Sequence, residues 1–118
     1  MGESLAGMSA VGLYLGLRKM FKDAVECEKA IGQALASACR EPWASISAEV
    51  ELDGVRVDAV VSYVRTDDGK VGFLTGVPRL ALYFSELARL VSTDEKGLFT
   101  SCRFELQSDG RYKSSFIY

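Results

Sequence analysis

The chain has 118 residues, a formal net charge of −2 and no histidine. This length suits one domain rather than two, and such a domain can fold without a disulfide or a metal. Sixteen acidic residues against fourteen basic ones argue against a nucleic-acid binder, and the missing histidine removes the commonest general base and metal ligand.

The first seventeen residues are apolar but do not fit a signal peptide. Glu3 precedes the apolar run and Arg18 and Lys19 follow it, which reverses the charge order of such a peptide. The run is interrupted by glycines and is too short to span a bilayer. We expect a poorly ordered or frayed helical N-terminus over 1–17, followed by a single domain over 18–118.

The first regular element predicted is a helix over residues 18–40. Small and apolar residues recur there at steps of three and four, and polar residues lie between them, which is typical of a helix with one buried stripe. The stripe comprises Met20, Ala24, Cys27, Ile31, Ala34, Leu35 and Ala38. Pro42 then stops the helix.

Three strands follow, over residues 43–52, 55–65 and 71–77. In the first, apolar residues alternate with Ser and Glu, the period-2 pattern of a strand with one buried face. Val60 and Val64 make the second face of the next strand partly apolar. The turns contain Asp53-Gly54 and Asp68-Gly69, whose residue types favour tight hairpins, so the three strands predict an antiparallel meander.

A second helix is predicted from about Pro78 to Val91, and a final hairpin over 98–118. Cys102, Phe104 and Leu106 alternate with polar residues, and Asp109-Gly110 supplies the turn. The order is therefore α-β-β-β-α-β-β.

The fold class predicted is α+β, with a five-stranded antiparallel sheet and both helices packed on one face. We expect the covered face to carry Ile46, Val50, Val57, Val61, Phe73, Phe104 and Phe116. The open face is expected to carry Glu49, Glu51, Arg56, Asp58, Arg103, Glu105 and Lys113.

Few residues look catalytic. The three cysteines are irregularly spaced, which suits a reducing cytoplasm, and Cys102 is expected in the core. Glu49 with Glu51, or Glu51 with Asp58, could form a carboxylate pair, but the polar-out alternation favours a solvated strand face. We predict no catalytic residue, no metal and no cofactor.

The open face is the main functional feature. Its acids lie within twenty residues of one another and would steer a basic partner onto this surface, although charges of this kind would also serve solubility alone. The acids are Glu49, Glu51, Asp53, Asp58, Asp67 and Asp68. Trp43 is either a binding anchor or a lid packed at the sheet end.

Several short runs resemble the YezG-like immunity family, small bacterial cytosolic proteins that neutralise polymorphic or contact-dependent toxins, commonly nucleases. The resemblance covers roughly residues 31–118, and its most specific part is the closing pattern from Gly110 to Tyr118. The other matching residues are Glu41-Pro42-Trp43, Tyr63, Phe84-Ser85-Glu86-Leu87 and Phe104-Glu105-Leu106.

The resemblance implies a cytoplasmic protein that is not an enzyme and whose partner is a cognate protein toxin. An acidic sheet face would mimic the phosphates that a nuclease toxin binds. We expect Glu49, Glu51 and Asp58 to contribute, with Trp43 or Tyr63 as an apolar anchor. Nucleic acid and membrane are not expected as partners, and a homodimer is left open.

Two other functions remain at this point. The element order and acidic pI also resemble type III secretion chaperones, which dimerise and hold an unfolded effector segment. Those proteins usually carry a further C-terminal helix, whereas this sequence stops at Tyr118. An enzyme is the third option and would have to work with carboxylates alone.

Overall fold

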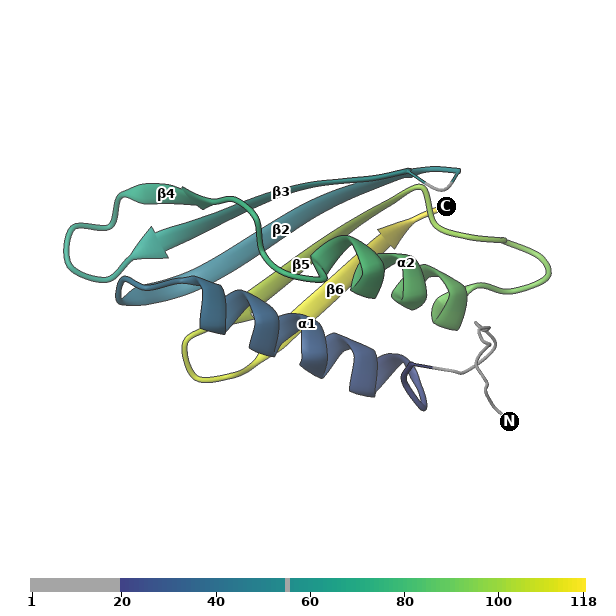
Figure 1. The fold of residues 1–118 in the computed structure, drawn as a ribbon, viewed down its shortest axis with the longest axis horizontal. Coiled ribbons are helices and arrows are strands. Elements are labelled where there is room, and N and C mark those ends of the chain that lie inside the picture. Colours follow the sequence, from purple (N-terminus) through teal and green to yellow (C-terminus); the bar gives the residue numbers. More distant parts are fainter. Residues whose placement is uncertain (1–19, 55) are drawn as a thin grey trace, which may run out of the picture.

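The computed structural model describes residues 20–54 and 56–118, which form a five-stranded antiparallel sheet with two helices on one face (Figure 1). This confirms the predicted fold class and element order. The elements are α1 (Ala24–Ala38), β2 (Trp43–Asp53), β3 (Arg56–Arg65), β4 (Val71–Leu74), α2 (Leu80–Val91), β5 (Ser101–Gln107) and β6 (Tyr112–Ile117). The prediction for residues 1–17 lies outside the described residues.

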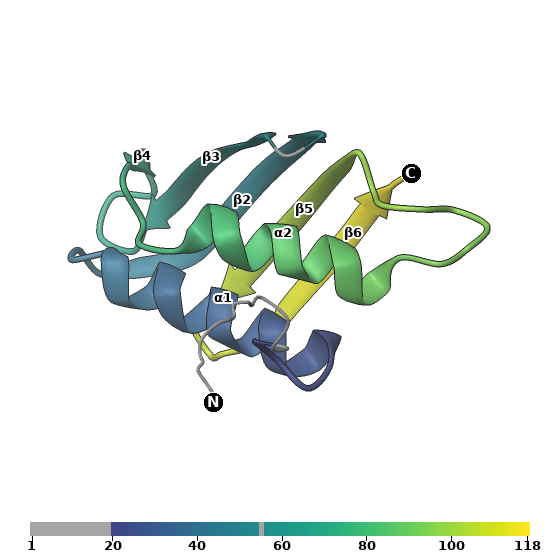
Figure 2. The same ribbon diagram turned by 45° about the vertical axis from the view of Figure 1, so that its right-hand side comes forward.

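The strand order in the sheet is β4-β3-β2-β5-β6, so β2 lies in the centre and pairs on both sides. The Asp-Gly turns form as predicted, because Gly54, Gly69 and Gly110 adopt positive φ angles of 63°, 69° and 93°. The link from β4 to β5 runs through α2, which carries the chain from one side of β2 to the other. Figure 2 shows α1 and α2 side by side over the same sheet face.

Both helices begin later than the sequence pattern suggests. The Asp23 carboxylate accepts a hydrogen bond from the Glu26 backbone N–H at 2.9 Å, which fixes the start of α1 at Ala24. Arg79 has a φ of 63°, in the left-handed region, so α2 starts at Leu80 and not at Pro78. No helix in the described part of the chain is long and apolar enough to cross a membrane.

The core lies between the two helices and the inner face of the sheet, which is the face that they cover. Phe104 of β5 is fully buried, with Phe84 of α2 packed edge-to-face at 6.4 Å and Tyr112 stacked at 5.5 Å between ring centroids. The other fully or nearly fully buried residues include Cys27, Ile31, Leu35, Ile46, Ala48, Val50, Leu87, Phe99 and Cys102. The predicted core position of Cys102 is therefore confirmed.

The prediction that Phe73 lies in the core is wrong. This side chain is 67% exposed, because β4 pairs Phe73 with Ser62, which points away from the helices. Leu74, opposite the buried Val61, takes the inner position. Val71 and Phe73 thus lie on the outer face, which is the sheet face that the helices leave open.

Phe104 and Phe73 provide a matched test of this register. Replacement of the buried Phe104 by Ala is expected to lower the free energy of unfolding by about 3–5 kcal/mol. The same change at the exposed Phe73 is expected to cost less than about 1 kcal/mol. Chemical denaturation followed by circular dichroism measures both values, and equal losses would show that β4 is assigned to the wrong register.

Candidate functional site

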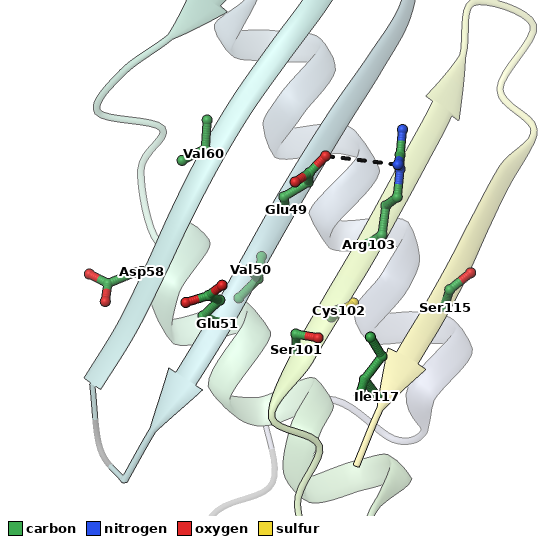
Figure 3. Close-up of a pocket in the computed structure, with 10 residues that line it drawn as sticks. All are labelled: Glu49, Val50, Glu51, Asp58, Val60, Ser101, Cys102, Arg103, Ser115 and Ile117. Carbon is green, nitrogen blue, oxygen red and sulfur yellow. Dashed lines mark ion pairs between the residues drawn. The ribbon is translucent and has the colours of Figure 1, made fainter.

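The outer face gathers the predicted acidic side chains. Glu49 and Glu51 project from β2, Asp58 from β3, and Arg103 from β5, as Figure 3 shows. They share a face because the neighbouring positions in β2, Val50 among them, are buried against the helices. The predicted open face is therefore present in the structure.

The sheet register sets two carboxylates directly against each other. Glu51 of β2 lies opposite Asp58 of β3, an arrangement of like charges that destabilises an antiparallel strand pair. Arg56 lies beside Asp58 at 3.1 Å. Within residues 20–54 and 56–118, Glu51 has no ion pair, so its carboxylate is available to an incoming cation.

The other carboxylates of the outer face, those of Glu49 and Glu105, are partly neutralised by Arg103. Glu49 lies opposite Arg103, but their charged atoms are 3.9 Å apart, and Arg103 contacts Glu105 more closely, at 2.9 Å. All these side chains except Glu105 are well exposed, and exposed ion pairs contribute about 0–1 kcal/mol each. Their arrangement therefore affects what can bind the face more than it affects stability.

Large apolar side chains lie among these charges. Val60, Val71, Phe73 and Ile117 all project from the outer face and are at least 60% exposed. Val60 and Ile117 lie on opposite sides of a depression of about 540 Å³ over the middle of the sheet (Figure 3). A face that served only to keep the strands soluble would not concentrate such residues, whereas a binding surface would.

Asp67 and Asp68 do not belong to this face, contrary to the sequence-based prediction. They lie in the β3–β4 turn, at the far end of β3 from Asp58, and approach the Arg65 guanidinium at 3.6 and 3.4 Å. The carboxylate of Glu41 also binds Arg65, at 2.8 Å, and is the main cause of the raised pKa of Arg65. These acids therefore belong to a separate ion network.

Trp43 and Tyr63, the predicted apolar anchors, do not join the carboxylates of the outer face. Both are half-buried and pack against the core. The Tyr63 hydroxyl donates a hydrogen bond to Glu41, which raises the pKa of Tyr63. The exposed apolar groups beside the acids are instead those of Val60 and Ile117. The partly apolar second face of the 55–65 strand was a sequence signal for Val60, whereas Ile117 had no such signal.

Gly72 leaves the space that the end of the Tyr63 ring occupies over β4. A Cβ at position 72 would come within 2.5 Å of the Tyr63 ring carbon that bears the hydroxyl. Tyr63 lies opposite Gly72 in the register, and its hydrogen bond to Glu41 restrains the ring. Glycine is therefore required here by close approach.

Gly72→Ala is expected to lower the free energy of unfolding by about 1–3 kcal/mol, because the ring has to move and give up its contact with Glu41. In a Tyr63→Ala background the same change should cost little. A double-mutant cycle by chemical denaturation measures the coupling. Equal costs in the two backgrounds would mean that the ring is not the obstacle.

The described residues hold no group of three or more His, Cys, Asp or Glu side chains that could bind a metal ion. Burial raises the pKa of both Cys27 and Cys102 to about 12, so neither is a thiolate near neutral pH. The Cys27 thiol also donates a hydrogen bond to the Tyr83 carbonyl at 3.3 Å. These two thiols are core groups.

Thiol labelling tests whether Cys27 and Cys102 are core groups. At about pH 8, a disulfide reagent is expected to modify Cys39, which is half-buried, well before Cys27 and Cys102. Addition of denaturant should expose all three thiols to rapid reaction. Rapid modification of Cys102 in the folded protein would contradict its assignment as a core residue.

The sequence matches no model of a known protein family, and no curated protein matches it. The likeness to the YezG-like family thus rests on the short runs of residues quoted above and stays a prediction.

Proposed function

We propose that this chain is a cytoplasmic bacterial immunity protein that neutralises a protein toxin by stoichiometric binding, without catalysis. One observation carries the proposal: the uncovered face of the sheet combines exposed carboxylates with exposed large apolar side chains. Protein interfaces need both, because apolar contacts supply affinity and charges supply orientation and rate.

The geometry of the face supports a preformed binding surface. Glu49 and Glu51 project from the central strand, which is paired over its length with β3 and over seven positions with β5. A paired strand in the middle of a sheet loses little further conformational freedom when a partner binds. Less of the binding free energy is then spent on ordering the surface.

The charge on this face favours a basic partner. Glu51 and Asp58 lie opposite each other, with one arginine beside them, so a cation placed between them would relieve their repulsion. A nuclease toxin binds phosphates in a basic cleft, which is the surface that such carboxylates would block. This fits the resemblance to the YezG-like family, whose toxins are commonly nucleases.

A secretion chaperone of the type III class is the second candidate. It is favoured by the exposed Val71 and Phe73 near the sheet edge, which could hold an unfolded apolar segment. A chaperone of this class is an obligate dimer, so a monomer in light scattering would exclude it. An immunity protein is expected to protect cells from a folded toxin.

Charge reversal tests the proposed surface. The double variant Glu49→Lys and Glu51→Lys is expected to slow association with the toxin domain encoded by the neighbouring reading frame by roughly tenfold at low salt. The difference should shrink as salt screens the charges. Stopped-flow or surface-plasmon-resonance kinetics measure the rates.

The matched control is Asp94→Lys with Glu95→Lys, which makes the same change in net charge in the exposed loop after α2. It should alter the rate much less. Equal effects of the two double variants would assign the slowing to net charge alone. Failure of the wild-type protein to protect cells that express the toxin would overturn the proposed function itself.

A further inference from the structure

The edge strand β4 covers only half of β3. Its four residues pair with positions 61–64 of β3, whereas β3 begins at Arg56. Residues 56–60 pair with β2 on one side, and on the other side the described chain provides no strand. We call this unpaired half of the β3 edge, formed by residues 56–60, the vacant lane.

The vacant lane is open to solvent. Asp58, Ala59 and Val60 are three consecutive exposed residues. Ala59 is exposed even though positions 57 and 59 face the helix side of the sheet, where a covered strand would be buried. No backbone hydrogen bond reaches residues 56–60 from the described loop after β4. Alternate residues of an edge strand direct both N–H and C=O outwards, so the lane offers a row of free donors and acceptors.

We propose that the vacant lane binds an extended segment of the toxin, which continues the line of β4 and adds a strand to β3. This inference rests on the proposed function for the identity of the partner. Strand addition supplies affinity through main-chain hydrogen bonds, and the side chains beside the lane supply specificity.

The side chains on the outer face define the chemistry of the segment. A residue paired with Asp58 lies about 4.8 Å away, one strand spacing, with Glu51 on the next strand beyond. A Lys or Arg at that position would offset both carboxylates. Two residues along, the segment pairs with the exposed Val60 and approaches Phe73 of β4, which favours an aliphatic or aromatic side chain. The expected motif is therefore basic-x-apolar or its reverse.

A random library of linear peptides displayed on phage tests this on the full-length protein. Enriched peptides are expected to carry a Lys or Arg two positions from a large apolar residue. Amide resonances of residues 56–60 should shift on binding of a selected peptide. Val60→Lys, which places a charge on the edge, is expected to weaken binding by about tenfold or more.

Val25→Lys is the matched control, because Val25 is also an exposed valine, at 50%, but lies on α1 and not on the outer face. It should change affinity less than about twofold. Asp58→Lys is a second test variant and should also weaken binding. All three substituted positions are exposed, and thermal melting checks that each variant is folded.

Several outcomes would overturn the proposal. These are the absence of enriched peptides, enriched peptides without the motif, or equal losses from Val60→Lys and Val25→Lys. Only the amides that point away from β2 report on the lane. Slow exchange of those outward-pointing amides within residues 56–60 of the unliganded protein would mean that another part of this chain, or a second copy, already fills the lane.

Toxin protection separates this inference from the proposed function. If Val60→Lys protects cells as well as the wild type while reversal at Glu49 and Glu51 does not, the toxin binds the face without using the lane. If the wild type does not protect, the proposed function fails, and the peptide selection still reports whether the lane binds an extended segment.

Discussion

The placement of β2 between β3 and β5 is the constraint on which the rest of the structure depends. Ile46, Ala48 and Val50 are buried against the helices, and the side chains of a strand alternate between faces. Glu49 and Glu51 must therefore face solvent. A slip of one residue would bury these carboxylates and expose the core residues, a cost that holds the register in place. The same burial that stabilises the fold also assembles the acidic surface.

The features that the sequence predicts well are those in which local patterns agree with the tertiary structure. Strands β2 and β5 alternate strictly, and each hairpin has an Asp-Gly turn whose glycine takes the required positive φ. Helix spacing placed Ile31 and Leu35 correctly in the core. Element order, the covered face and the positions of Glu49, Glu51 and Asp58 could therefore be predicted before the structure was known.

The incorrect predictions fall where the local pattern is ambiguous. In β4, Val-Gly-Phe-Leu has an apolar residue on either parity, so alternation cannot tell whether Phe73 or Leu74 faces the core. Its orientation depends on a turn that pairs Phe73 with Ser62. Closeness in sequence likewise suggested that Asp67 and Asp68 join Asp58, but an extended ten-residue strand separates its two ends widely. The contact of Tyr63 with Glu41 spans the chain and has no local signal.

The passage of the chain through α2 between β4 and β5 has a consequence for folding during synthesis. Ala48 of the central strand pairs with Phe104. One of the two hydrogen-bonding edges of β2 therefore stays unpaired until residues much later in the chain have been synthesised. Until β5 leaves the ribosome, the nascent chain exposes an unprotected strand edge and the apolar groups that Phe104 will cover. Contacts so distant in sequence slow folding and leave partly made chains prone to aggregation. A ribosome that pauses before β5 has emerged from its exit tunnel would thus hold this protein in a form that is prone to aggregate.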